Sequence, residues 1–135
     1  MLLFQMTSLI ATAGEGKGTW ALLYKLIAQE PWDAIYIVTT PYGMEHFLPA
    51  KEIHCICIDS VLPIHQIKNT IKKGISGKIN DLETALCLIS GNGKDHMAVL
   101  GAIAELGLGY RLVSIENERM VEVQANFMCD GSGTL

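Results

Sequence analysis

The feature that most constrains this fold is the alternation of apolar, branched runs with stretches of helical spacing. Apolar runs predict strands at 1–11, 33–40, 54–59 and 84–90. Helical stretches are predicted between and after them, at 19–30, 44–48, 60–74 and 94–106. Strands that alternate with helices are typical of a parallel sheet joined by right-handed crossovers. We therefore expect an α/β fold with a largely buried sheet.

The chain is predicted to complete the sheet with a β-hairpin. Residues 110–115 and 119–124 have the pattern of strands, and the polar turn 116–118 separates them. We expect the strand order 3-2-1-4-5, with the last strand antiparallel at the edge. The prediction is a Rossmann-like, doubly wound, mainly parallel sheet in one domain over 1–125, followed by a loose tail over 126–135.

Individual residues predict where the helices begin and end. Ser60 is expected to cap the helix that follows it, with Pro63 in its first turn and Gly74 as its C-terminal stop. Pro31 and Gly107 are expected to end the first and the last helix. The lysines of the helix after Ser60 are expected on its solvated face: Lys68, Lys72 and Lys73.

Composition limits the partners of this chain. Half of its residues are apolar and 18% are charged, against roughly 25% in typical soluble domains, so we expect apolar surface to be buried between subunits. The net charge of −4 argues against binding to duplex nucleic acid, which requires a basic face. The apolar start, 1–12, lacks a basic region, which predicts a buried strand and neither a signal peptide nor a membrane span.

The cysteines bear on the cellular compartment and on metal binding. Cys55, Cys57, Cys87 and Cys129 lie mostly in apolar runs without CxxC spacing, which predicts reduced core cysteines of a cytoplasmic protein. Cys55 and Cys57 would share one face of a strand, whereas the adjacent His54 would point to the opposite face. We therefore expect no metal site, and the sequence indicates no cofactor.

Two loops that carry glycine and lysine are the main functional signal, ATAGEGKGTW at 11–20 and SGNGKDHM at 90–97. In the expected strand order they face each other across the crevice where doubly wound sheets bind ligands. The first loop is not a Walker A motif, because Ala11 and Gly18 stand where a glycine and a hydroxyl are required. It also departs from the dinucleotide fingerprint, because Thr19 replaces the third glycine.

Two interpretations of these loops remain open. Glycines let backbone N–H groups approach an anion, a helix N-terminus adds its dipole, and Lys17 and Lys94 supply charge, which together predict an anionic ligand. Alternatively, Gly14, Gly16 and Gly18 only form a tight turn between a strand and a helix.

The segment from 88 to 113 resembles the second ligand motif of CARF domains, the CRISPR-associated Rossmann-fold family. In this chain the motif is carried by Gly91, Gly93, Lys94 and Met97, between an apolar strand and an alanine-rich helix. The resemblance implies a homodimer that binds a cyclic oligoadenylate, the second messenger of type III CRISPR defence. Family members generally carry a C-terminal effector domain, and nothing in the tail of this chain resembles one. Some stand-alone members are ring nucleases, which cleave the messenger.

The resemblance also implies roles for individual residues. The loop at 12–19 falls where the family has its first ligand motif. Expected ligand-binding residues are Gly14, Glu15, Gly16, Lys17, Gly18, Thr19, Ser90, Gly91, Asn92, Gly93, Lys94 and Met97. For ring cleavage, Lys94 and Lys17 would stabilise phosphate charge, and Thr12, Ser90 or Thr19 would orient the attacking hydroxyl. His96 would transfer the proton. His96 and Met97 have an alternative role in packing.

Three classes of function stay open at this point. The chain is a sensor that binds a nucleotide without turnover, a metal-independent ring nuclease, or a dimeric assembly domain whose glycine loops are only turns. Turnover of labelled cyclic tetra-adenylate would identify the nuclease, and binding without turnover would identify the sensor.

Overall fold

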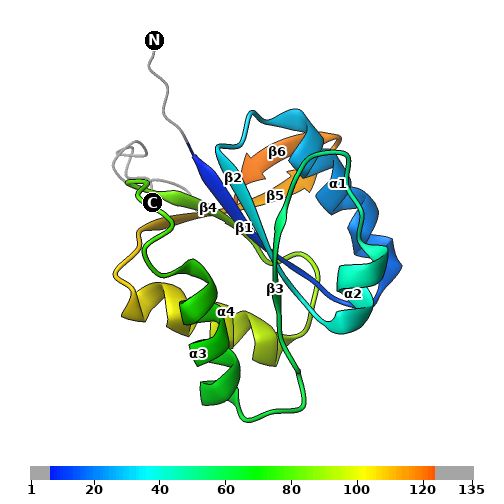
Figure 1. Cartoon of the computed structure of the whole chain (residues 1–135). Helices are drawn as coiled ribbons and strands as arrows, with labels where there is room; N and C mark the ends of the chain where they lie inside the picture. The colour runs from blue at the N-terminus through cyan, green and yellow to red at the C-terminus, as the bar shows by residue number, and fades with distance from the viewer. Residues whose placement is uncertain (1–6, 124–135) are drawn as a thin grey trace, which may run out of the picture.

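The computed structural model describes residues 7–123, arranged as shown in Figure 1. The strands are β1 (Ser8–Ala13), β2 (Ala34–Thr39), β3 (His54–Cys57), β4 (Thr84–Cys87), β5 (Tyr110–Glu116) and β6 (Arg119–Glu122). The helices are the short 3-10 helix η1 (Lys17–Thr19), α1 (Trp20–Gln29), α2 (Pro41–His46), α3 (Ile64–Ile75) and α4 (Gly93–Glu105). Residues 1–6, which open the predicted first strand, and the predicted loose tail, 126–135, lie outside the described residues.

The strand order β3-β2-β1-β4-β5-β6 confirms the predicted Rossmann-like, doubly wound sheet. β1 pairs in parallel with β2 and β4, which in turn pair in parallel with β3 and β5. β6 is antiparallel to β5 at the edge, as predicted for the hairpin. Asn117 and Glu118 form its turn with φ of 52° and 67°, the geometry that tight two-residue hairpin turns require. The carboxyl ends of β1 and β4 therefore lie side by side at the switch point.

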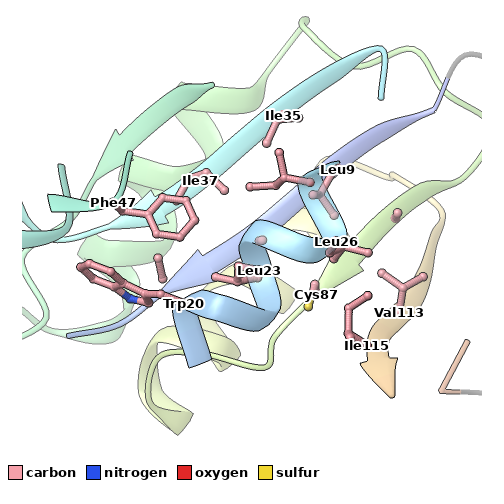
Figure 2. Close-up of a cluster of buried hydrophobic side chains, with 14 residues drawn as sticks. Leu9, Trp20, Leu23, Leu26, Ile35, Ile37, Phe47, Cys87, Val113 and Ile115 are labelled. Carbon is pink, nitrogen blue, oxygen red and sulfur yellow. The ribbon is translucent and has the colours of Figure 1, made fainter. Parts of the chain in front are cut away.

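An apolar layer covers each face of the sheet. Leu9 and Ile10 of β1 are both fully buried but belong to different layers, because side chains alternate along a strand. The first layer packs α1 and Phe47 on the sheet, as Figure 2 shows. The second packs α3 and α4 through residues such as Ile67 and Val99. Burial of both faces explains why the central strands appear in the sequence as continuous apolar runs.

The limits of α3 differ from the prediction. Pro63 occupies the N-cap position, and its side chain makes no capping hydrogen bond. Ser60 was expected in that role, but its Oγ donates to Asp95 at 2.8 Å. Gly74 does not end α3, which continues one residue further. A β-carbon on Gly74 would lie 2.8 Å from Cγ1 of Ile56, so this glycine permits the close approach of α3 to β3.

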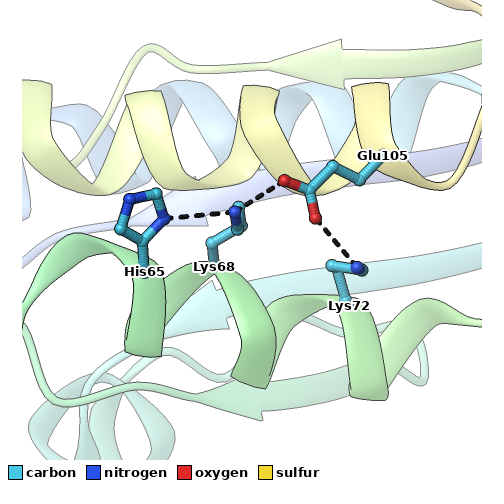
Figure 3. A network of polar contacts seen from close by, with 4 residues as sticks. All are labelled: His65, Lys68, Lys72 and Glu105. Carbon is cyan, nitrogen blue, oxygen red and sulfur yellow. Dashed lines mark hydrogen bonds and ion pairs between the residues drawn. The ribbon is translucent and has the colours of Figure 1, made fainter.

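Two lysines predicted for the solvated face of α3 instead reach α4. Lys68 Nζ lies 2.6 Å from Oε2 of Glu105, and Lys72 Nζ lies 2.8 Å from Oε1 of the same carboxylate (Figure 3). Hydrogen bonds from Lys68 and then Lys72 hold the pKa of Glu105 at about 2. Lys73 is exposed, as predicted. The prediction for Lys68 and Lys72 was therefore wrong, since they form ion pairs between the two helices.

The cysteines differ in exposure. Cys87 is buried and Cys55 is half-buried, whereas Cys57 is exposed on the edge strand β3 and is not the core residue that its sequence context predicts. Burial raises the pKa of the Cys55 and Cys87 thiols. Cys129 lies outside the described residues. Within 7–123, no helix combines the length and the apolar character needed to cross a membrane.

Candidate functional site

The loops that follow β1 and β4 touch each other at the carboxyl edge of the sheet. A β-carbon on Gly14 would lie 2.8 Å from both Cα and N of Gly91. Gly91 has a φ of +99°, in the left-handed region that favours glycine. The two loops therefore lie side by side, as the strand order predicts. Their contact requires glycine at position 14, and the backbone conformation favours glycine at position 91.

Ser90 links the two loops through hydrogen bonds. Its Oγ accepts from the backbone N–H of Gly14 at 2.8 Å, and its carbonyl accepts from Thr12 Oγ1 at 2.5 Å. Nε2 of His96 lies 2.7 Å from the same carbonyl and donates to it in the Nε2–H tautomer. Thr12 and His96, both predicted to act on a ligand, are thus engaged in holding the second loop.

A pocket of about 560 Å³ opens between the loops, within the range of about 300–1,000 Å³ typical of small-molecule sites. Its wall brings together these predicted residues: Thr12, Gly14, Glu15, Gly16, Gly18, Thr19, Ser90, Gly91 and Asn92. It adds residues for which the sequence indicated no contact with a ligand: Ala13, Val38, Thr39, Thr40, Ser60, Ile89 and Asp95. Val38, Thr39 and Thr40 lie at the end of β2 and directly after it, and Ser60 follows β3, because those strands end at the same edge of the sheet.

Gly16 and Gly18 line this pocket without a packing reason to be glycine. A β-carbon on either residue would meet no atom of the described part of the chain within 4 Å, and neither residue has a positive φ. In this they differ from Gly14, which the loop contact requires. The absence of side chains at these two positions keeps the backbone open to a bound molecule.

Hydroxyl groups fix the polar side of the first loop. Thr40 Oγ1 donates to a carboxylate oxygen of Glu15 at 3.2 Å. Thr19 Oγ1 donates to the carbonyl of Gly16, also at 3.2 Å. Glu15 is exposed, so it brings negative charge to the mouth of the pocket. This charge disfavours a phosphate beside Glu15 and favours a hydrogen-bond donor there.

Some predicted site residues are absent from the pocket wall. Lys94 Nζ donates to the carbonyl of Ser60 at 3.0 Å, which ties α4 to the loop after β3. Gly93 begins α4, and Met97 is 60% exposed one turn later. The backbone of Lys17 lies in η1, and its side chain is outside the described part of the chain.

Asp95 is a buried carboxylate in the pocket wall that the sequence did not reveal. It is 6% exposed, and its Oδ2 accepts from Ser60 Oγ at 2.8 Å. Its Oδ1 has no hydrogen-bond partner among the described residues. Asn92, the N-cap of α4, accepts from the backbone N–H of Asp95 at 2.8 Å. The Asn-x-x-Asp spacing marks a helix start, but it does not show that the carboxylate turns toward Ser60.

The site combines open glycine backbone, hydroxyl groups, a helix N-terminus and buried negative charge. The N-terminus of the thirteen-residue α4 attracts anions, whereas Asp95 and Glu15 attract hydrogen-bond donors. Such a mixture suits a ligand that carries both an anionic group and hydrogen-bond donors. The described chain, 7–123, contains no group of three or more His, Cys, Asp or Glu residues arranged to hold a metal ion.

Comparison with known proteins does not identify the site. No protein-family model matches the chain, and no curated protein matches it at a significant level. What the pocket binds must therefore follow from its own shape and chemistry.

Proposed function

We propose that this chain binds a nucleotide in the pocket between the β1 and β4 loops, and that the ligand class is a cyclic oligoadenylate. The observation that carries the proposal is the open backbone at Gly16 and Gly18, where packing does not require glycine. The pocket lies at the switch point of a doubly wound sheet, which is where such folds bind ligands.

The sequence at the start of α4 supports this choice of ligand. Gly91, Gly93, Lys94 and Met97 have the spacing that resembles the CARF ligand motif. Gly93 is the first residue of α4, so an anion bound beside it gains from the helix dipole. Lys94 contributes its charge by exchanging the Ser60 carbonyl for a phosphate oxygen.

The proposal includes a homodimer. A ring of several nucleotides exceeds one pocket of about 560 Å³, so two pockets related by a two-fold axis would share it. Segments that adjoin the pocket expose apolar side chains, with Met44 at 44%, Val61 at 84% and Met97 at 60%. Burial of these side chains between two copies is favourable. Light scattering at micromolar concentration should therefore show a dimer, and a monomer at all concentrations would contradict this part.

The geometry favours binding over turnover. Thr12 and His96 both engage the Ser90 carbonyl. A group that orients the attacking hydroxyl or transfers its proton has to reach the reacting atoms to act. We therefore propose a nucleotide sensor, and the experiment below separates it from a ring nuclease.

Titration with cyclic tetra-adenylate and cyclic hexa-adenylate, followed by chromatography of the products, tests the proposal. We expect binding without product. Gly16→Val places a side chain in the pocket and should weaken binding at least about tenfold. Ala104→Val adds bulk at an exposed position near the C-terminal end of α4 and should bind like the wild type. No binding of either ring contradicts the proposal, and product formation identifies a nuclease.

A further inference from the structure

Asp95 is a buried carboxylate that lacks a full set of hydrogen-bond donors, and this is energetically unfavourable. The residue is 6% exposed in the pocket wall, and Ser60 donates to its Oδ2 at 2.8 Å. Its Oδ1 is shielded from solvent and accepts no hydrogen bond from a residue within 7–123. A buried acceptor that lacks a donor destabilises the folded state, and a charged acceptor does so more strongly.

The position of Asp95 in its helix does not account for this arrangement. A carboxylate at the third residue of a helix commonly turns back to the N-cap backbone N–H, as in a capping box. In α4 the cap is supplied by Asn92, which accepts from the Asp95 N–H at 2.8 Å. The Asp95 carboxylate instead reaches Ser60, in the loop after β3. One oxygen is thereby fixed, and the other remains without a donor on a residue that lines the pocket.

We propose that Oδ1 of Asp95 accepts a hydrogen bond from a neutral donor on the nucleoside part of the ligand, either a ribose hydroxyl or an adenine amino group. The inference rests on the nucleotide binding proposed above. An ionised carboxylate only accepts hydrogen bonds and repels a phosphate, so its partner is not the phosphate itself. Because Oδ1 is shielded from solvent, binding requires a rotation of the carboxylate about its broad terminal torsion, which turns Oδ1 toward the ligand.

The role assigned to Asp95 is that of a specificity residue. The phosphates meet the N-terminus of α4 and Lys94, and the nucleoside meets the buried carboxylate. A site that contains a buried acceptor discriminates strongly against a ligand that lacks the matching donor, because the acceptor then stays unpaired in the complex.

Asp95→Asn separates this role from a structural one. The amide has the shape of the carboxylate, and its oxygen still accepts from Ser60, but it places an NH₂ donor where the free acceptor stood. We expect the affinity for cyclic tetra-adenylate to fall about 10- to 100-fold. The melting temperature without ligand should not fall, because the variant removes a buried charge.

Asp59→Asn is the matched control. It makes the same chemical change at an exposed carboxylate next to Ser60 that is absent from the pocket wall. Asp59 accepts only locally, from the backbone N–H of Val61 at 3.1 Å, and an asparagine oxygen can do the same. The Asp59→Asn protein should therefore bind cyclic tetra-adenylate like the wild type, although it loses the same unit of charge.

Two modified rings identify the donor. A ring with 2′-deoxyribose lacks the hydroxyl, and a ring with hypoxanthine bases lacks the amino group. The wild type should bind the ring that lacks the donor more weakly than the natural ring. With that modified ring, Asp95→Asn should bind no more weakly than the wild type does.

The outcomes distinguish the two proposals. If the wild type binds no ring, the proposed function fails. If the wild type binds and Asp95→Asn binds equally well, the proposed function stands and the role of Asp95 is overturned. An affinity loss that is equal for the natural ring and both modified rings, together with a lower melting temperature, also overturns it, because Asp95 is then structural.

Discussion

Gly14 and Gly91, on loops that follow neighbouring strands, approach so closely that a β-carbon on Gly14 would lie 2.8 Å from two backbone atoms of Gly91. Because the crowded atoms of Gly91 belong to the backbone, no side-chain rotation relieves the contact. Hydrogen bonds from Gly14 and Thr12 to Ser90 hold the same two loops together. The contact thus sets the separation of the loops on either side of the pocket.

The first prediction compares two glycines of the same loop. Gly14→Ala should lower the free energy of unfolding by about 1–3 kcal/mol, because the added methyl group overpacks against backbone. Gly16→Ala should leave it unchanged or raise it by up to about 1 kcal/mol, since its methyl group meets no atom and the unfolded chain loses entropy. Urea unfolding measures both values. An equal loss of unfolding free energy in the two variants would contradict this prediction, because a methyl group would then be no more crowded at position 14 than at position 16.

The strands and the hairpin could be predicted because their patterns are local in the sequence, and the strand order could be predicted because alternating strands and helices favour a doubly wound sheet. The ends of α3 could not. Gly74 follows two lysines and looks like a helix stop, but it is required by Ile56, a distant residue in the chain. Lys68 has the spacing of a solvated residue, yet the packing of α4 beside α3 brings Glu105 within 2.6 Å of it. Contacts between segments that are distant in the sequence therefore determine both the end of α3 and the position of Lys68.

The candidate site was predictable as a pair of loops but not as a set of side chains. Lys94 and Asp95 are neighbours in the first turn of α4, and a charge-based prediction selects Lys94 as the ligand contact. In the structure Asp95 lines the pocket, and Lys94 donates to the Ser60 carbonyl. Ser60, which contacts both residues, lies in the loop after β3. No sequence pattern within α4 therefore shows that Asp95 lines the pocket and Lys94 does not.

The second prediction concerns the ion pairs of Glu105. The pKa of this carboxyl is about 2 in the folded protein, against an ordinary value of 4.5. Because the folded-state pKa is lowered, the pairs with Lys68 and Lys72 stabilise the protein above about pH 4.5, and this contribution is lost as the pH falls toward 2. Glu105→Gln should therefore lower the melting temperature at pH 7, and the difference from the wild type should shrink between pH 5 and pH 2.

Salt gives an independent check on these ion pairs. The Glu105 side chain is 44% exposed, so about 1 M salt should also reduce the difference between Glu105→Gln and the wild type. Glu52→Gln, at an exposed position before β3, should show neither dependence. A difference in melting temperature that stays constant from pH 7 to pH 2 would mean that Glu105 acts by packing and not by charge.

The third prediction tests the coupling of Ser60 to Asp95. Ser60→Ala should lower the free energy of unfolding by about 1–3 kcal/mol, because it removes the donor to Oδ2 and leaves a buried carboxylate unpaired. In the Asp95→Asn background the loss should be smaller, since a neutral amide is less unfavourable without a partner. A double-mutant cycle by urea unfolding measures the difference. The same loss in both backgrounds would show that Ser60 stabilises the fold through other contacts.

The last prediction concerns Lys94, which precedes the wall residue Asp95 in the sequence. Lys94→Ala should weaken binding of cyclic tetra-adenylate by about 1.5–3 kcal/mol, which is the contribution of a charge-assisted hydrogen bond. Thermal stability should change little, because the one hydrogen bond that the ammonium donates to a described residue goes to the Ser60 carbonyl, at 3.0 Å. Lys68 is an unsuitable control, because it forms an ion pair with Glu105.

Lys73→Ala is the better control, because Lys73 is exposed on α3 and its substitution removes the same charge as Lys94→Ala does. Calorimetric titration of the wild type and both variants with cyclic tetra-adenylate measures the affinities to be compared. If Lys94 keeps its bond to Ser60 when ligand binds, both variants will lose little affinity and added salt will remove both losses, since both then act only through long-range charge. A larger loss for Lys94→Ala, and one that added salt reduces only in part, means that the ammonium leaves Ser60 and contacts a phosphate directly.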